Sequence, residues 1–319
     1  MDKKSIRADG LLLLTAAIWG FAFVAQRVGM DYAGPFTFGA VRFLLGALSL
    51  VPLILVIDRK EAKKREAAPK TAVGRLIFAS CIAGLCLFAG SGLQQVGLYW
   101  TTAGNSGFIT GVYVVLVPVA GVFLGRKTGL PTWVGALLTF AGLFLVSGIA
   151  GGGTAAGGLN KGDVLTFIGG LFWTCHVLVI DRLVKKTPAL KLSCGQFAVC
   201  GLLSLAAAAF NVPARIGMGT PPEIFSAGFT AASLVGAAIP ILYGGICSVG
   251  IAYTLQVVAQ QWAHPAHASI ILCLESVFAT IGGVLLLSEK PGLITLIGFG
   301  LMLTGMIASQ AEVFGKKRP

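Results

Sequence analysis

Long apolar runs alternate along this chain with short polar or charged segments. Residues 268–287 read ASIILCLESVFATIGGVLLL, with one acid in an almost uninterrupted apolar run. A helix needs about 20 such residues to cross a hydrocarbon layer about 30 Å thick. Divided at charges, prolines and glycine clusters, the sequence predicts an all-α transmembrane protein with ten helices, near residues 10–28, 35–57, 75–97, 102–124, 131–149, 163–183, 192–211, 230–258, 266–287 and 292–311.

Composition agrees with a membrane protein. Of 319 residues, 56% are hydrophobic and 11% are charged, whereas an ordinary soluble domain is about 25% charged. The net charge of +12 does not indicate nucleic acid as a partner, because lysine and arginine stand in short clusters between apolar runs. All seven cysteines lie within apolar runs, without a CxxC pair or a His/Cys cluster. We therefore expect no disulfide, no metal and no other cofactor.

The distribution of positive charge predicts the orientation. If the N-terminus is inside, 19 lysines and arginines fall on that side of the membrane and four on the other, with Arg42 within a span. Because these residues collect in cytoplasmic segments, both termini are predicted to be cytoplasmic. The expected location is the plasma membrane, or the inner membrane of a bacterium.

The two halves of the sequence are similar to each other. LQQVGLYW (93–100) corresponds to LQVVAQQW (255–262), and the rarer residues pair as Trp19 with Trp173 and Gln94 with Gln256. We therefore predict a duplication of five helices, and because five is odd, the two repeats enter the membrane from opposite faces. Inverted repeats of this kind are typical of alternating-access carriers, which bind substrate near the midplane between the repeats. The predicted units are a first repeat (1–149), a Gly-rich linker (150–162) and a second repeat with a basic tail (163–319).

Three segments resemble one known family. AAIWGFAFVAQR in the first span, GFITGVYVVLVPVAGVFLGRK in the fourth, and GIAYTLQVVAQQWAHPAHASIILCLESVFATIGGVLLLSEK across the eighth and ninth are similar to the drug/metabolite transporter superfamily, EamA type. The resemblance covers about residues 10–311. It implies a secondary-active carrier that exports or exchanges small metabolites, often amino acids or related compounds, without ATP. The two halves differ at the ends of the fourth and ninth spans, where LGRK in the first half corresponds to LLSEK in the second.

Glu275 is the leading candidate for a functional residue. An acid at the bilayer centre costs about 3 kcal/mol on insertion scales, so it usually faces a cavity or a partner and marks function; a structural acid bonded to a neighbouring helix is the alternative. Its counterpart in the first repeat is Val112. His176, in the middle of the sixth span, titrates near neutral pH. We hypothesise that Glu275 and His176 couple transport to protons, although a hydrogen-bonded core histidine fits the sequence nearly as well.

Other polar and aromatic residues in the spans are candidates for binding substrate. Paired amides can bind a polar solute and paired indoles can stack on it, but interhelical hydrogen bonding and packing explain such pairs equally well. The full predicted set of substrate-binding or coupling residues is Glu275, His176, Gln94, Gln256, Trp19, Trp173, Asn105 and Tyr113.

Two charged residues are expected at the membrane surfaces. Arg42 lies about seven residues into the second span, about 10 Å deep, where we expect it to snorkel outward rather than bind a substrate carboxylate. His267 is expected at the interface. Glycines seven apart, Gly135/Gly142 and Gly298/Gly305, predict close helix packing, within the monomer or at a homodimer interface.

Two other functions stay open on the sequence alone. GNSG (104–107) is similar to the G-x-S-G pattern of rhomboid proteases, with His176, His264 or His267 as the base. Four residues in a chain with 44 glycines are a weak signal, and rhomboid-like proteins are not built from five-plus-five inverted repeats, so we do not expect an enzyme. A lipid or headgroup flippase would show a lateral opening between helices.

Overall fold

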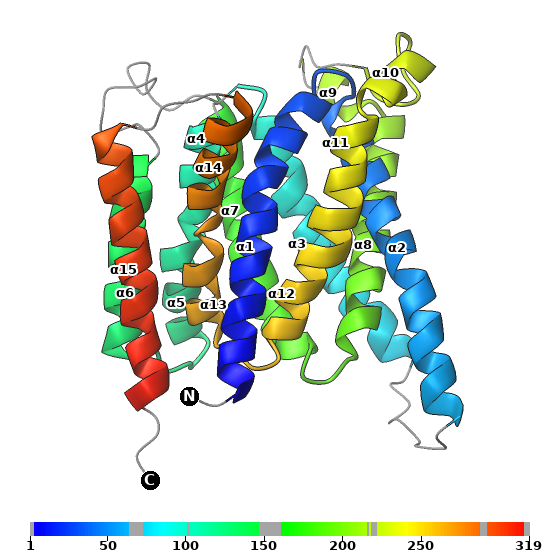
Figure 1. Ribbon diagram of the computed structural model, residues 1–319. Coiled ribbons are helices and arrows are strands. Elements are labelled where there is room, and N and C mark those ends of the chain that lie inside the picture. The colour runs from blue at the N-terminus through cyan, green and yellow to red at the C-terminus, as the bar shows by residue number, and fades with distance from the viewer. Residues whose placement is uncertain are drawn as a thin grey trace.

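The protein is a bundle of helices that run roughly parallel to one another (Figure 1). The computed structural model describes residues 3–63, 73–100, 103–146, 161–215, 217, 222–287 and 292–315. The first half contains α1 (Lys3–Gly29), α2 (Pro35–Lys63), α3 (Val73–Gly97), α4 (Ala103–Gly111), α5 (Tyr113–Phe123) and α6 (Leu130–Val146). The second half contains α7 (Lys161–Leu183), α8 (Ala189–Ala209), α9 (Val212–Arg215), α10 (Ala231–Gly236), α11 (Ala238–Leu242), the π-helix η3 (Tyr243–Tyr253), α12 (Thr254–Ala259), α13 (Pro265–Leu272), α14 (Glu275–Leu287) and α15 (Leu293–Gly315).

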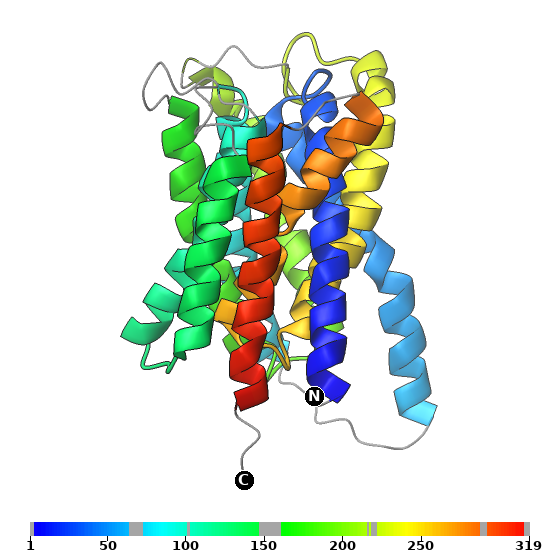
Figure 2. The ribbon, with the colours of Figure 1, turned by 60° about the vertical axis from the view of Figure 1, so that its left-hand side comes forward.

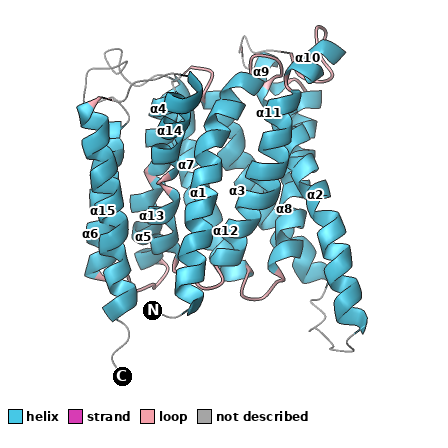
Figure 3. Ribbon diagram, in the orientation of Figure 1, coloured by secondary structure: helices cyan, strands magenta, loops and turns pink. Residues whose placement is uncertain are grey.

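These helices occupy all ten predicted spans. Across the described residues there is no strand (Figure 3). Seven helices in this part of the chain are long and apolar enough to cross a membrane, and shorter apolar helices at 109–123, 130–145 and 293–309 account for the other three spans. The prediction of an all-α membrane protein is therefore confirmed. The predicted linker lies almost entirely outside the described residues, so the domain boundaries stay a prediction.

Both termini lie at the same end of the bundle, which we call the terminal end (Figures 1 and 2). An even number of spans requires this arrangement. The cytoplasmic orientation of that end stays a prediction from the charge distribution.

The fourth and ninth spans are both broken in the middle. The fourth changes from α4 to α5 at Val112, and the ninth changes from α13 to α14 at Cys273 and Leu274. The two breaks also touch, since the Cys273 thiol lies 3.5 Å from the Gly111 carbonyl oxygen and donates to it. Because the breaks stand at corresponding places in the two repeats and meet in space, they support the predicted duplication. Carriers commonly use such discontinuous helices around the substrate site.

The eighth span contains eleven residues of π-helix, η3. Such helices are uncommon and often occur at functional sites. Glycines allow η3 to lie close to α2, because a Cβ on Gly245 would lie 2.7 Å from Leu45 and one on Gly250 would lie 2.5 Å from the Ser49 hydroxyl. The irregular helix is therefore held tightly against its neighbour from the other repeat.

The predicted glycine seams lie inside the monomer, between α6 and α15. A Cβ on Gly305 would lie 2.6 Å from the Gly135 carbonyl oxygen, and one on Gly142 would meet the Gly298 carbonyl oxygen. The last helix of the chain thus packs against the last helix of the first repeat, and Figures 1 and 2 show the two side by side. These glycines therefore pack against each other within one chain, and a homodimer stays a prediction.

At the end opposite the termini, a loop of the second repeat caps a helix of the first. The carboxylate of Glu223, fully buried, accepts hydrogen bonds from the backbone N–H groups of Phe36 (3.1 Å) and Thr37 (2.6 Å) and from the Thr37 hydroxyl. The first N–H groups of a helix have no partner within the helix. Glu223 satisfies two of them at the start of α2 and links the repeats at this end.

Candidate functional site

A cavity with an empty volume of about 560 Å³ lies between the two repeats. Its polar and charged lining residues come from both halves of the chain: Gln26, Arg42, Gln94, Thr110 and Tyr113 from the first, and Ser248, Tyr253, Gln256 and Glu275 from the second. Aromatic rings of Trp19, Phe23 and Trp173 complete much of the wall.

The cavity residues of the first repeat lie mainly in the half of the bundle that is farther from the termini, whereas Val177 and Gln256 of the second repeat lie toward the terminal end. α1 starts at the terminal end (Figure 1) and lines the cavity only with residues 19–26, in its second half. α2 starts at the opposite end and contributes Arg42, seven residues after its first residue Pro35. α3 contributes Gln94, close to its last residue.

The two repeat-related tryptophans stand on the cavity wall with Tyr253 between them. The Tyr253 ring lies 4.5 Å from the Trp19 ring, and it stacks on Trp173 at 6.0 Å with an angle of 17°. The Trp19 indole N–H donates to the Ser248 carbonyl oxygen at 3.2 Å. The indole nitrogen of Trp173 is buried without a partner in the described part of the chain. Trp19 is thus held by a hydrogen bond and by packing on Tyr253, and Trp173 by packing on the same ring.

The two repeat-related glutamines also line the cavity, and they differ in their bonding. Gln94 donates from its amide nitrogen to the Thr110 hydroxyl at 2.9 Å. Gln256 is 1% exposed, and its amide oxygen accepts no hydrogen bond from the residues that the structure describes. Gln94 therefore fits the packing interpretation of these amides, while the amide oxygen of Gln256 is buried without a partner among the described residues.

Glu275 is the first residue of α14, directly after the break in the ninth span. Its carboxyl lines the cavity at 7% exposure and forms no hydrogen bond or ion pair within the described residues. α1 comes close to this point because Gly20 has no side chain; a Cβ there would lie 2.7 Å from the Glu275 carbonyl oxygen. The helix break thus positions an unpartnered acid at the centre of the bundle.

Arg42 does not snorkel to the surface, and that expectation is wrong. It is 4% exposed and lines the cavity, with its guanidinium 5.3 Å from the Phe38 ring and 4.9 Å from the Phe43 ring. The two rings give the cation favourable partners inside the bundle. The side chain can therefore stay at its own depth instead of extending outward.

The remaining predicted residues lie in different surroundings. Tyr113 lines the cavity at the break in the fourth span. His176 is fully buried, donates a hydrogen bond from Nε2 to the Gln196 amide oxygen at 2.9 Å, and packs edge-on against Trp173 and Tyr253. It thus stands behind the cavity wall, and its coupling with Glu275 stays a prediction. Asn105 is in α4, and its side chain is outside what the structure describes.

The segment GNSG does not form a nucleophile and base pair. Ser106 is fully buried, and its hydroxyl has no hydrogen-bond partner within the described chain. His176 is bonded to Gln196, and His267 is bonded to Asp9. Neither histidine is therefore arranged to take a proton from Ser106.

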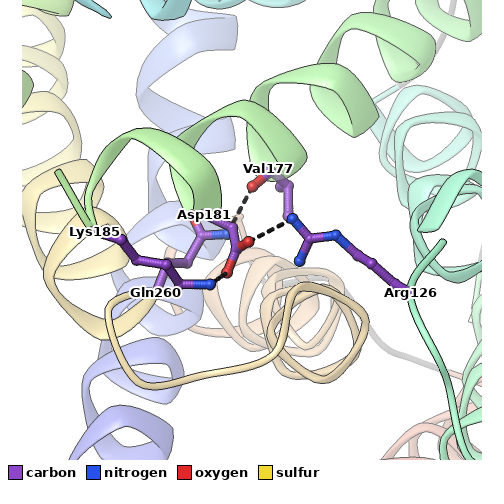
Figure 4. Close-up of polar contacts among 5 residues, drawn as sticks. All are labelled: Arg126, Val177, Asp181, Lys185 and Gln260. Atoms are coloured by element: carbon purple, nitrogen blue, oxygen red, sulfur yellow. Dashed lines mark hydrogen bonds and ion pairs between the residues drawn. The ribbon is translucent and has the colours of Figure 1, made fainter. Parts of the chain in front are cut away.

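A group of polar contacts surrounds Asp181 (Figure 4). Asp181, near the end of α7, forms ion pairs with Arg126 at 2.6 Å and with Lys185 at 3.0 Å. Gln260, fully buried, donates to the carbonyl oxygen of Val177 at 3.0 Å, and Val177 itself lines the cavity. Arg126 follows α5 of the first repeat, so its ion pair joins the two repeats. The pair lies about one helical turn along α7 from Val177 of the cavity wall.

His267, the third residue of α13, forms a second link at the terminal end, and its position at the membrane interface stays a prediction. It is 4% exposed, and its ring nitrogens bond to the Asp9 carboxylate at 2.9 Å and to the Ser309 hydroxyl at 3.0 Å. These contacts tie α13 to α1 and α15. A polar partner on each side explains why the ring stays buried.

Six of the eight predicted residues line the cavity. The sequence reasoning missed the cavity residues Tyr253, Ser248 and Thr110, and it also missed the ion pairs of Asp181. Asp181 has a signal in the sequence, since an acid four residues before Lys185 is a typical helix ion pair. Tyr253 and Ser248 are polar residues within an apolar span, which is also a visible signal. Thr110 has no such signal in the sequence. It is marked only by its position near the helix break at Val112, which the sequence did not predict.

Comparisons with known proteins agree with this architecture. The sequence pattern of the EamA-like transporter family matches residues 6–148 and again residues 160–309. An uncharacterized transporter of Archaeoglobus fulgidus is 29% identical over 316 residues, which cover 97% of this chain and 88% of the relative. The uncharacterized inner membrane transporter YedA of Escherichia coli K12 is 27% identical over 168 residues, 51% of this chain and 50% of YedA.

The fold is also found among solved structures, for example in a crystal structure that matches nearly the whole chain. It has a TM-score of 0.72 and covers 95% of this chain and 98% of its own, at 17% identity. The family pattern, which matches once in each half, thus agrees with the two-repeat helical bundle. The chain is an integral membrane protein that transports small molecules, and it belongs to the EamA-like transporter family.

Proposed function

We propose that the protein is a secondary-active carrier that exports or exchanges small metabolites such as amino acids by alternating access. The observation that carries this proposal is the cavity between the repeats, which is lined by an unpartnered carboxyl and an unpartnered guanidinium. Mixed charge with aromatic walls suits a small solute that has both polar and apolar parts. The sequence has no Walker-type phosphate loop, which agrees with transport that does not use ATP.

The contacts at the two ends support a cycle between two states. Arg126–Asp181 and His267–Asp9 close the terminal end, and opening that end requires both to separate. The opposite end is linked by the Glu223 carboxylate at α2. With both termini cytoplasmic, the contacts at the terminal end lie on the cytoplasmic side of a plasma or bacterial inner membrane. Inverted repeats can then exchange conformations to open the cytoplasmic side.

Glu275 is the group that we propose for proton coupling. A carboxyl without a partner inside the bundle can bind a proton in one state of the cycle and release it in the other, if the two states expose it differently to water. His176 bonds to Gln196 and packs on two cavity residues, so we propose that its protonation state affects the cavity wall. The proton as coupling ion is part of this proposal.

Counterflow in proteoliposomes tests the proposed function. Vesicles loaded with one amino acid are given labelled solutes from a panel of amino acids, other metabolites and a fluorescent lipid, with and without a pH gradient. We expect saturable exchange of a subset of small solutes and a response to the gradient. In Glu275→Gln vesicles the response to the gradient should disappear, while Asp58→Asn, which removes an exposed ion pair with Lys191, should behave as wild type.

Two results would contradict the proposal. If no solute exchanges, the protein is not a carrier of the tested classes. If only the lipid moves between leaflets, the flippase alternative is correct instead.

A further inference from the structure

Arg42 and Glu275 differ from the other buried charged residues of the described chain, because both lack an ion pair or a hydrogen bond. Asp181 has Arg126 and Lys185 as partners, and Glu223 accepts from the α2 backbone. Arg42 is 4% exposed, and its Nε–H is fully enclosed without an acceptor in the described residues. Burying a guanidinium without an anionic partner is costly. A residue kept in this state in the wall of a cavity therefore indicates an anion that arrives from outside.

The surroundings of Arg42 hold its guanidinium and leave its hydrogen-bonding groups available. Phe38 and Phe43 contact the cation through their rings, and rings do not accept its N–H groups as a carboxylate would. Space for the stem comes from Gly244 of η3, where a Cβ would lie 3.6 Å from the Arg42 Cδ. Arg42 thus stands on α2, supported by its own helix and by the π-helix of the other repeat. A planar guanidinium held in this way matches a carboxylate with two parallel hydrogen bonds.

The position of the two charges in the cavity indicates the arrangement of the ligand. Tyr253, which packs against both tryptophans, lines the same cavity as Arg42 and Glu275. The cavity therefore presents a cation and an acid around a shared aromatic surface. A phosphate would be expected to need several cations, and Arg42 is the only lysine or arginine among the lining residues. These features favour a single carboxylate.

We propose that Arg42 binds the carboxylate of the transported solute and makes a carboxylate a requirement for recognition. The inference rests on the proposed function, since it assigns one contact in the cavity that the carrier would use. Arg42 then acts as a specificity residue, and the aromatic wall of Trp19 and Trp173 contacts the apolar part of the solute.

Matched solutes test this proposal in the full-length protein in proteoliposomes. The probes are alanine, leucine and phenylalanine, each with its amide, which lacks the carboxylate, and its N-acetyl derivative, which keeps it. We expect the wild type to exchange acids and N-acetyl acids in preference to the amides. Arg42→Gln should raise the half-saturation concentration for the acids about 10- to 100-fold, as expected for the loss of a charge-assisted hydrogen-bond pair. Exchange of the amides should not change.

Two further variants keep the test decisive. Arg42→Lys keeps the charge but loses the planar fork, so it should retain a preference for acids with weaker binding. Arg27→Gln, which changes an exposed arginine at the end of α1, serves as the matched control and should behave as wild type. Folding is checked by thermal unfolding in detergent.

The results separate this inference from the proposed function. If the wild type exchanges acids and amides equally well, or if folded Arg42→Gln keeps the wild-type preference, the carboxylate assignment is wrong while the carrier function stands. If Arg42→Gln lowers exchange of acids and amides to the same extent, Arg42 is structural and the assignment is also wrong. If the wild type exchanges nothing, the proposed function itself fails.

Discussion

The ion pair between Arg126 and Asp181 gives a direct test of how the terminal end is closed. Arg126 follows α5 in the first repeat and Asp181 is on α7 in the second, whereas Lys185 is on the same helix as Asp181. Opening the terminal end therefore separates Arg126 from Asp181 and leaves the contact with Lys185 intact. Asp181→Asn removes the charge with little change in size, so it should weaken the closed state selectively.

The size of the effect follows from the exposure of the three side chains. The Asp181 side chain is 2% exposed, and breaking a buried ion pair costs about 3–5 kcal/mol. Arg126 and Lys185 are 18% and 55% exposed, so in the variant both cations can turn toward water. We therefore expect a smaller loss for the closed state, about 1–3 kcal/mol, which is roughly a 5- to 150-fold shift of the equilibrium toward opening.

Hydrogen–deuterium exchange in lipid nanodiscs measures this shift. In Asp181→Asn, peptides covering residues 124–130 and 177–186 should exchange faster than in wild type. Asp58→Asn is the control, because it breaks the Asp58–Lys191 pair of 2.9 Å, which also joins the two repeats but is 41% and 37% exposed. An exposed pair contributes about 0–1 kcal/mol, so this control should leave exchange almost unchanged.

A double-mutant cycle decides whether the pair itself is responsible. Arg126→Gln alone should increase exchange in the same peptides, and the double variant with Asp181→Asn should add little, because the two residues share one interaction. The reasoning would be refuted if Asp181→Asn exchanged no faster than Asp58→Asn, or if the effects of the two single variants simply added.

Three further predictions concern helix packing and the two ends of the bundle. Gly142→Ala should destabilise the protein by about 1–3 kcal/mol in thermal unfolding, because the new methyl group meets the Gly298 carbonyl oxygen, whereas Gly300→Ala, with no atom within 4 Å, should not. Glu223→Ala should cost about 1–3 kcal/mol in the same assay, since it leaves the first N–H groups of α2 without an acceptor. His267→Phe should speed hydrogen–deuterium exchange in the first turns of α1, because it removes the contact with Asp9; unchanged exchange there would contradict that role.

The sequence was sufficient for the fold because the membrane restricts the choice. Apolar runs of the right length must be helices there, since every backbone polar group needs a partner. The breaks at Val112 and at Cys273 and Leu274 could not be predicted in this way. GFITGVYVV is a continuous apolar run, and its interruption depends on contacts such as that between Cys273 and Gly111, which are distant in the sequence.

Contacts between residues that are distant in the sequence also explain why the expectation for Arg42 was wrong and why the partner of His267 was not predicted. Depth along a helix was known for Arg42, but depth does not tell which face of α2 turns inward. His267 bonds to Asp9, 258 residues away, and no local pattern predicts that partner. Trp19 and Trp173, by contrast, were found because their relation is a repeat of the sequence itself. Long-range partners are set by packing, and a single sequence contains little information about them.

The comparison of the two repeats separates the scaffold of the cavity from its chemistry. The residues that the repeats share, Trp19 with Trp173 and Gln94 with Gln256, all line the cavity and are neutral. The charged residues are not shared, because Val112 corresponds to Glu275. Arg42 likewise corresponds to neutral Gln196, which bonds to His176 instead of facing the cavity.

A symmetric wall suits a carrier that must form similar surfaces in two opposite states. A binding site that distinguishes one end of a solute from the other needs charges of opposite sign at different places, and identical repeats cannot supply them. Duplication therefore accounts for the shape of the cavity and for its aromatic wall. Arg42 and Glu275 differ from their counterparts and give the cavity its two charges, and this is why these two residues are the ones in which recognition and coupling should be sought.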